Sequence, residues 1–76
     1  MFEVYYRSPV DPRKEAKLTE QVASLGGQLT CHEPPDDNYW AVVLTYEFDD
    51  WDQAEAAAGV LRTQGEHVEG PMDYGD

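Results

Sequence analysis

The chain has few of the residues that would crosslink it or anchor it in a membrane. Its 76 residues include a single cysteine, Cys31, which excludes an intrachain disulfide. No apolar run approaches the roughly 20 residues that cross a bilayer, and the N-terminal MFEVYYRSP lacks the basic and apolar regions of a signal peptide. We therefore expect one cytoplasmic domain over residues 1–76, with no membrane association.

Basic residues are also scarce. Five lysines and arginines stand against sixteen aspartates and glutamates, for a net charge of −11 at pH 7. The charges of residues 1–32 cancel, so the whole excess lies in residues 33–76, where Arg62 is the sole basic residue. Such a field repels nucleic acid and favours a basic protein partner. It also keeps a small protein soluble, and that simpler reading stays open.

Four segments alternate apolar and polar residues with a period of two, the pattern of strands that are half buried in a sheet. The longest of them is apolar on both faces, which predicts a position in the middle of the sheet. The predicted strands cover residues 1–8, 28–33, 39–48 and 66–69.

Two further segments carry apolar residues at helical spacing, and glycines follow both. They cover about residues 12–25 and 51–64. Asp11 and Asp50 stand at the expected N-caps, and Gln53 is spaced to complete a capping box with Asp50. The apolar stripe predicted for the second helix comprises Trp51, Ala54, Ala58 and Leu61.

The order strand, helix, strand, strand, helix, strand is that of the ferredoxin-like fold. We therefore predict an α+β, βαββαβ two-layer sandwich with a four-stranded antiparallel sheet. Right-handed crossovers place the first and third strands at its centre and both helices on one face. Residues from about 70 to 76 are expected to form a loose tail. The helix-covered face is expected to carry Phe2, Val4, Tyr6, Leu29, Trp40, Val42, Leu44 and Tyr46.

The opposite face of the predicted sheet is open and mildly apolar, with a polar rim. RNA-binding members of this superfold surround their aromatics with basic residues, which are missing here, so no nucleic acid is expected. Such a surface more often packs against a second copy or a partner protein. The acidic turn after the third strand is a further candidate for a basic partner. The candidate residues are Tyr5, Arg7, Tyr39, Ala41, Val43 and Thr45 on the face, and Asp49, Asp50 and Asp52 in the turn.

Catalytic and metal-binding motifs are not found. The acids from Asp49 to Glu55 lack the spacing of a calcium loop and suit a helix N-terminus. Cys31 and His32 are adjacent, so on a regular strand they point to opposite faces, and Cys31 is expected in the core. The sequence has no nucleophile elbow, phosphate loop, HExxH or CxxC motif. We expect no catalytic residue, metal or cofactor, and favour a non-catalytic protein.

One alternative stays open. Two chains can pair their sheet faces and enclose a cleft that binds a small ligand or performs catalysis. Such a site requires a concave pocket with converging polar groups. Its candidate lining residues are Tyr5, Tyr39, His32 and His67.

The segment YEFDDWDQAEAAAGVLRTQGEHVE, residues 46–69, resembles the strand, acidic helix start, helix and returning strand of small acidic ferredoxin-like bacterial proteins. One such family is the regulator of ribonuclease E activity B. The resemblance implies a non-enzymatic inhibitor that binds another protein. The matching positions are core and cap positions: Ala54, Ala57, Ala58, Leu61 and Gly65.

Overall fold

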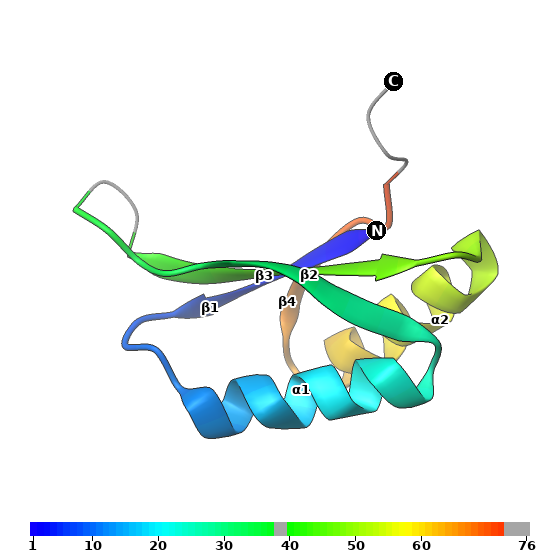
Figure 1. Cartoon of the computed structure of the whole chain (residues 1–76), viewed down its shortest axis with the longest axis horizontal. Coiled ribbons are helices and arrows are strands. Elements are labelled where there is room, and N and C mark those ends of the chain that lie inside the picture. Colours follow the sequence, from blue (N-terminus) through cyan, green and yellow to red (C-terminus); the bar gives the residue numbers. More distant parts are fainter. Residues whose placement is uncertain (38–39, 73–76) are drawn as a thin grey trace.

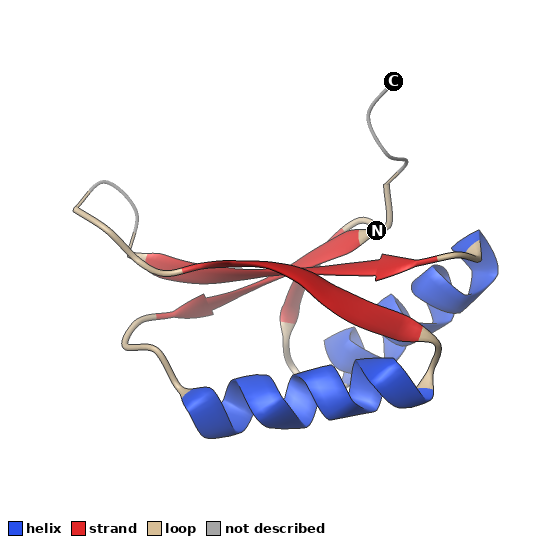
Figure 2. Cartoon of the chain, viewed as in Figure 1, coloured by secondary structure: helices blue, strands red, loops and turns tan. Residues whose placement is uncertain are grey.

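The computed structural model describes residues 1–37 and 40–72 and confirms the predicted α+β fold. The strands form one antiparallel sheet in the order β2-β3-β1-β4, so the first and third strands are central, as predicted. Both helices lie on one side of the sheet, and the other side is open (Figures 1 and 2). This is the ferredoxin-like two-layer sandwich. The elements are β1 (Phe2–Arg7), α1 (Pro12–Ser24), β2 (Gly27–Glu33), β3 (Ala41–Phe48), α2 (Trp51–Thr63) and β4 (His67–Glu69).

The core lies between the helices and the sheet. Alternate residues of β1 and β3 point toward the helices, and α2 contributes small side chains that let it lie close to the sheet. Each large side chain buried here contributes about 1.5–3 kcal/mol to folding. Tyr46 is fully buried, and its hydroxyl lies 2.9 Å from Thr19 Oγ1 in α1. The side chains that are fully buried include Phe2, Val4, Val42, Leu44, Tyr46, Ala57, Ala58 and Leu61.

Both predicted N-caps are present. The side chain of Asp11 accepts a hydrogen bond from the Lys14 amide at 3.1 Å, and that of Asp50 accepts one from the Asp52 amide at 2.8 Å. The side chain of Gln53 lies beside Gly26, in the turn between α1 and β2. Gln53 therefore extends toward that turn, which has a positive φ of 98° at Gly26.

The expectations that Trp40 and Trp51 pack in the core were wrong. Trp40 is 60% exposed: it precedes β3, and although its carbonyl oxygen accepts the Ser8 amide proton at 3.0 Å, its indole lies against Arg7 instead of in the core. Leu29 pairs with Tyr46 and so lies on the helix-covered face as expected, but it is 37% exposed because β2 is an edge strand. Trp51 begins α2 and is also exposed, so the alanines and Leu61 alone anchor that helix.

A bulge in β2 changes which side chains face the helices. Leu29 pairs with Tyr46 and Cys31 pairs with Thr45, so Thr30 is an extra residue in the ladder. The insertion shifts Cys31 to the open face, where it is exposed. The expectation that Cys31 belongs to the core was therefore wrong, because one extra residue reverses the facing of all that follow.

The chain after β4 returns to the start of β1. Arg62 Nη2 donates hydrogen bonds to the carbonyl oxygens of Val68 and Gly70. The Met72 amide donates to the Met1 carbonyl at 2.8 Å. Residues 73–76 of the predicted tail lie outside the described residues. In the described part of the chain, neither helix has the length and apolar character needed to cross a membrane.

Candidate functional site on the open sheet face

The strand register brings five of the candidate residues together on the open face. Tyr5 lies between Val43 of β3 and His67 of β4, and Arg7 lies opposite Ala41. Thr45 is on the same face, two residues from Val43 along β3. The three β3 residues are buried even without a helix above them, so neighbouring side chains cover them. Tyr39 lies outside the described residues.

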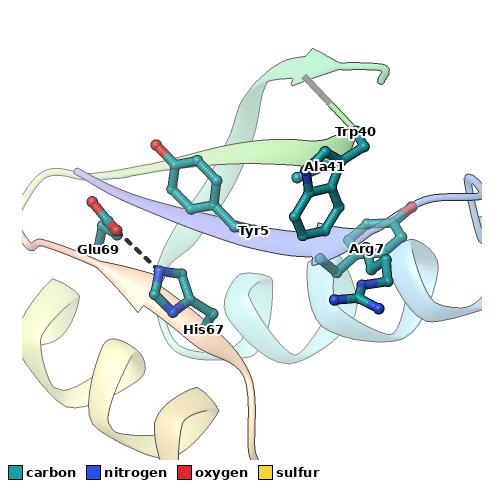
Figure 3. Close-up of a pocket in the computed structure, with 7 residues that line it drawn as sticks. Tyr5, Arg7, Trp40, Ala41, His67 and Glu69 are labelled. Carbon is teal, nitrogen blue, oxygen red and sulfur yellow. Dashed lines mark hydrogen bonds and ion pairs between the residues drawn. The ribbon is translucent and has the colours of Figure 1, made fainter. Parts of the chain in front are cut away.

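A hollow of about 350 Å³ opens on this face. Figure 3 shows the rings of Tyr5 and Trp40 beside it, with His67 and Glu69 on one side and Arg7 on the other. Trp40 is absent from the site predicted from sequence because alternation along β3 assigns it to the core. The residues that line the hollow are Tyr5, Tyr6, Arg7, Trp40, Ala41, His67 and Glu69.

Neighbouring side chains hold both aromatic walls in position. The Tyr5 hydroxyl donates a hydrogen bond to Glu3 Oε1 at 2.8 Å, and the Tyr5 ring meets the His67 ring edge-on at 5.7 Å. The guanidinium of Arg7 lies 4.8 Å from the centroid of the Trp40 ring, at cation–π distance. A surface that is ordered in this way loses little side-chain freedom when it binds a partner.

The charge of the open face is mainly negative. Among the described strand residues, Arg7 is the one lysine or arginine on this side of the sheet. His67 Nε2 lies 2.9 Å from Glu69 Oε2, and both side chains are more than half exposed. The carboxylates on this face belong to Glu3, Glu33, Glu47 and Glu69.

The acidic turn is a separate surface. Asp49, Asp50 and Asp52 are exposed and follow the end of β3, whereas Ala41 begins that strand. At roughly 3.3 Å per residue, the seven steps from Ala41 to Phe48 span about 23 Å. The structure therefore does not bring the two groups of candidates together, and Asp50 also caps α2.

A second polar cluster, which the sequence did not suggest, lies on the helix side. Glu15 of α1 accepts a hydrogen bond from the Tyr6 hydroxyl, and His32 Nε2 lies 3.1 Å from the same carboxylate oxygen. The Tyr6 hydroxyl in turn accepts the Asp11 amide proton at 3.0 Å. Burial raises the pKa of Tyr6 to about 12, and the nearby Glu15 carboxylate adds to the shift.

This cluster fastens α1 to β1 and β2. It also places His32 away from the hollow, so His32 does not join Tyr5 and His67 in one site. The bulge at Thr30 turns His32 to the helix side, and the alternation of residues in β2 alone does not reveal this bulge. No group of three or more metal-binding side chains occurs within residues 1–37 and 40–72.

The fold and the hollow define a small ferredoxin-like protein that has an aromatic depression, lined also by Arg7, His67 and Glu69, on its open sheet face. Comparison of the chain with protein-family models, curated proteins and solved structures finds no match. The resemblance to the regulator of ribonuclease E activity B thus has no support from a family model, and the ferredoxin-like topology is the part of it that the structure shows.

Proposed function

We propose that this chain is a non-catalytic protein-interaction module that binds a basic protein partner through its open sheet face. The observation that carries the proposal is Trp40, which is 60% exposed beside Tyr5 at the edge of a hollow. Tryptophan and tyrosine are enriched at interface centres, where they supply large contact areas at low entropic cost. A side chain of this size is a natural anchor for a partner.

The charge of the open face favours one of the two kinds of partner that the sequence left open. Two copies that met through this face would bring together eight carboxylates, four from each, with only two arginines. Like charges across an interface are costly, whereas a basic partner meets a complementary surface. A basic partner is therefore favoured over a homodimer that uses this face.

The acidic turn fits the same proposal. Asp49, Asp50 and Asp52 add to the negative field without being part of the hollow. A field of one sign increases the rate at which an oppositely charged protein arrives. The turn thus steers a basic partner, and the hollow anchors it. Inhibition of another protein, which the resemblance of residues 46–69 implies, is one use of such an interaction.

A small-ligand site is the second candidate. The volume of the hollow lies within the range of about 300–1,000 Å³ that is usual for ligand pockets. The hollow is lined by the apolar side chain of Ala41 and by the polar side chains of Arg7, His67 and Glu69. A ligand would bind here with or without a second chain, and a metabolite panel followed by shifts in melting temperature tests this candidate.

The test of the main proposal compares the two exposed tryptophans. The wild-type chain, Trp40→Ala and Trp51→Ala are used to capture proteins from the organism that encodes the chain. We expect a basic protein that Trp40→Ala loses and Trp51→Ala retains, because Trp51 is similarly exposed but lies at the start of α2. The captured protein is then purified and its affinity is measured by calorimetry.

Three results contradict the proposal. The first is that no captured protein depends on Trp40, and the second is that the dependent proteins are acidic. The third is that wild-type chain alone forms a dimer in sedimentation experiments and Trp40→Ala dissociates it. That last result would identify the open face as a self-association surface.

A further inference from the structure

We infer that the hollow beside Tyr5 and Trp40 binds the guanidinium group of an arginine side chain on the partner. This inference rests on the proposed function and adds the chemical group that is recognised. It depends on three features of the hollow: its aromatic walls, its carboxylates and the separation of its charges.

The aromatic walls suit a planar cation. A guanidinium stacks on tyrosine and tryptophan rings, and it is more weakly hydrated than an ammonium group. The chain already contains one such contact, since the Arg7 guanidinium lies 4.8 Å from the Trp40 ring centroid. Tyr5, held in place by Glu3 and His67, supplies the ring on which the partner's guanidinium stacks, because Arg7 lies against Trp40.

The carboxylates supply the matching acceptors. Glu69 uses Oε2 in its contact with His67, which leaves Oε1 to accept a further N–H. Glu69 is the carboxylate that lines the hollow, and Glu3 pairs with it across the β1–β4 ladder, so a second carboxylate lies next to that end of the hollow. A guanidinium presents N–H donors in a fork that fits carboxylate oxygens, whereas an ammonium group presents a single point.

Charges of opposite sign lie at opposite ends of the hollow. Arg7 and Glu3 are on the same face of β1, four residues apart, which corresponds to about 13 Å along the strand. A partner's cation therefore has a favourable position between Tyr5 and Glu69, away from Arg7. Arg7 then remains able to donate hydrogen bonds to carbonyl oxygens of the partner backbone.

The experiment uses three blocked peptides of glycines that differ only at the central residue, which is arginine, citrulline or lysine. Citrulline has nearly the shape of arginine but no charge. The full chain carries Trp51→Phe, so that Trp40 is its one fluorophore of this kind. We expect the arginine peptide to change Trp40 emission saturably and to bind at least about fivefold more tightly than either other peptide, as stacking and charge together imply.

Variants of the chain locate the binding. Glu69→Gln should weaken the arginine peptide about tenfold, as expected for loss of a charge-assisted hydrogen bond. Glu55→Gln is the matched control, because it removes one exposed carboxylate from α2, on the other side of the sheet. In spectra of methyl-labelled alanine, the peptide should shift Ala41, which lines the hollow, and leave the core residue Ala54 unchanged.

Equal binding of the arginine and citrulline peptides overturns the inference, as does equal binding of arginine and lysine. An unchanged affinity in Glu69→Gln overturns it as well. If a basic partner depends on Trp40 but the peptides show no preference for arginine, the proposed function stands and the inference fails. If the arginine peptide binds the hollow but no partner depends on Trp40, the proposed function fails instead.

Discussion

Replacing Gly27 by alanine tests how closely the first residue of β2 packs against the core. An ideal Cβ at this position would lie 2.4 Å from Phe48 Cζ and 2.6 Å from Val22 Cγ1. Both neighbours are almost fully buried, at 6% and 1% exposure, so neither side chain can move into solvent. The added methyl group must therefore displace the ring of Phe48 or separate β2 from α1.

The expected cost follows from measured overpacking. Forcing an extra methyl group into a filled core costs about 1–3 kcal/mol, and the double contact at Gly27 favours the upper part of that range. A chain of 76 residues is expected to have a free energy of unfolding of about 4–11 kcal/mol. Gly27→Ala should thus remove a large part of the stability.

Urea unfolding followed by circular dichroism measures this change, and Gly59→Ala provides the control. A Cβ at Gly59 in α2 meets no atom within 4 Å. Alanine is a better helix former than glycine, so that variant should gain about 0.5–1 kcal/mol. The two glycine-to-alanine changes are thus predicted to have opposite signs.

A stability of Gly27→Ala equal to or above that of the wild type would refute the packing described for β2, α1 and Phe48. Loss of stability in both variants would show instead that the effect comes from the backbone of glycine and not from the contacts of its neighbours. The midpoint of thermal unfolding gives an independent check, since 1 kcal/mol corresponds to about 4–8 °C in a domain of this size.

Two further predictions concern Tyr6 and Cys31. Because the pKa of Tyr6 is raised from 10.0 to about 12 in the fold, its contribution to stability is complete below pH 10 and is lost as the pH rises to about 12. Two pH units correspond to at most about 2.7 kcal/mol, and Tyr6→Phe should flatten the fall in urea stability over this range; an unchanged slope contradicts the assignment. The thiol of Cys31 should react with Ellman's reagent in the folded chain nearly as fast as in urea, because it is exposed; strong protection would show that β2 has no bulge at Thr30.

Most of the fold could be predicted from the spacing of apolar residues and from the residues that begin and end the helices. Alternation in β1 and β3, together with Asp11, Pro12 and Asp50 at the helix starts, is enough to order the elements and to identify the central strands. Alternation and helix caps are properties of neighbouring residues, so they predict the individual strands and helices well. The edge strand β2 is different. Which of its side chains face the helices depends on the bulge at Thr30, and no residue at that position is typical of a bulge.

The candidate site was predicted only in part. Tyr5 and Arg7 were expected on the open face and lie there, since their positions follow from the alternation of β1. Trp40 was missed because alternation gives the facing of a residue but not the point where pairing ends. Trp40 lies one residue before β3, where its backbone still bonds to Ser8 but its indole stacks on Arg7.

The edges of the sheet also restrict how any partner can attach. Strands at an edge offer free backbone groups to which another chain can add a strand. Here one edge strand, β4, has three residues, and the other, β2, is interrupted by its bulge. Neither edge provides a long, regular template, so the sheet is protected against growth into larger assemblies. Under the proposed function, recognition is then left to side chains on the face, where single substitutions can change the choice of partner without disturbing the backbone.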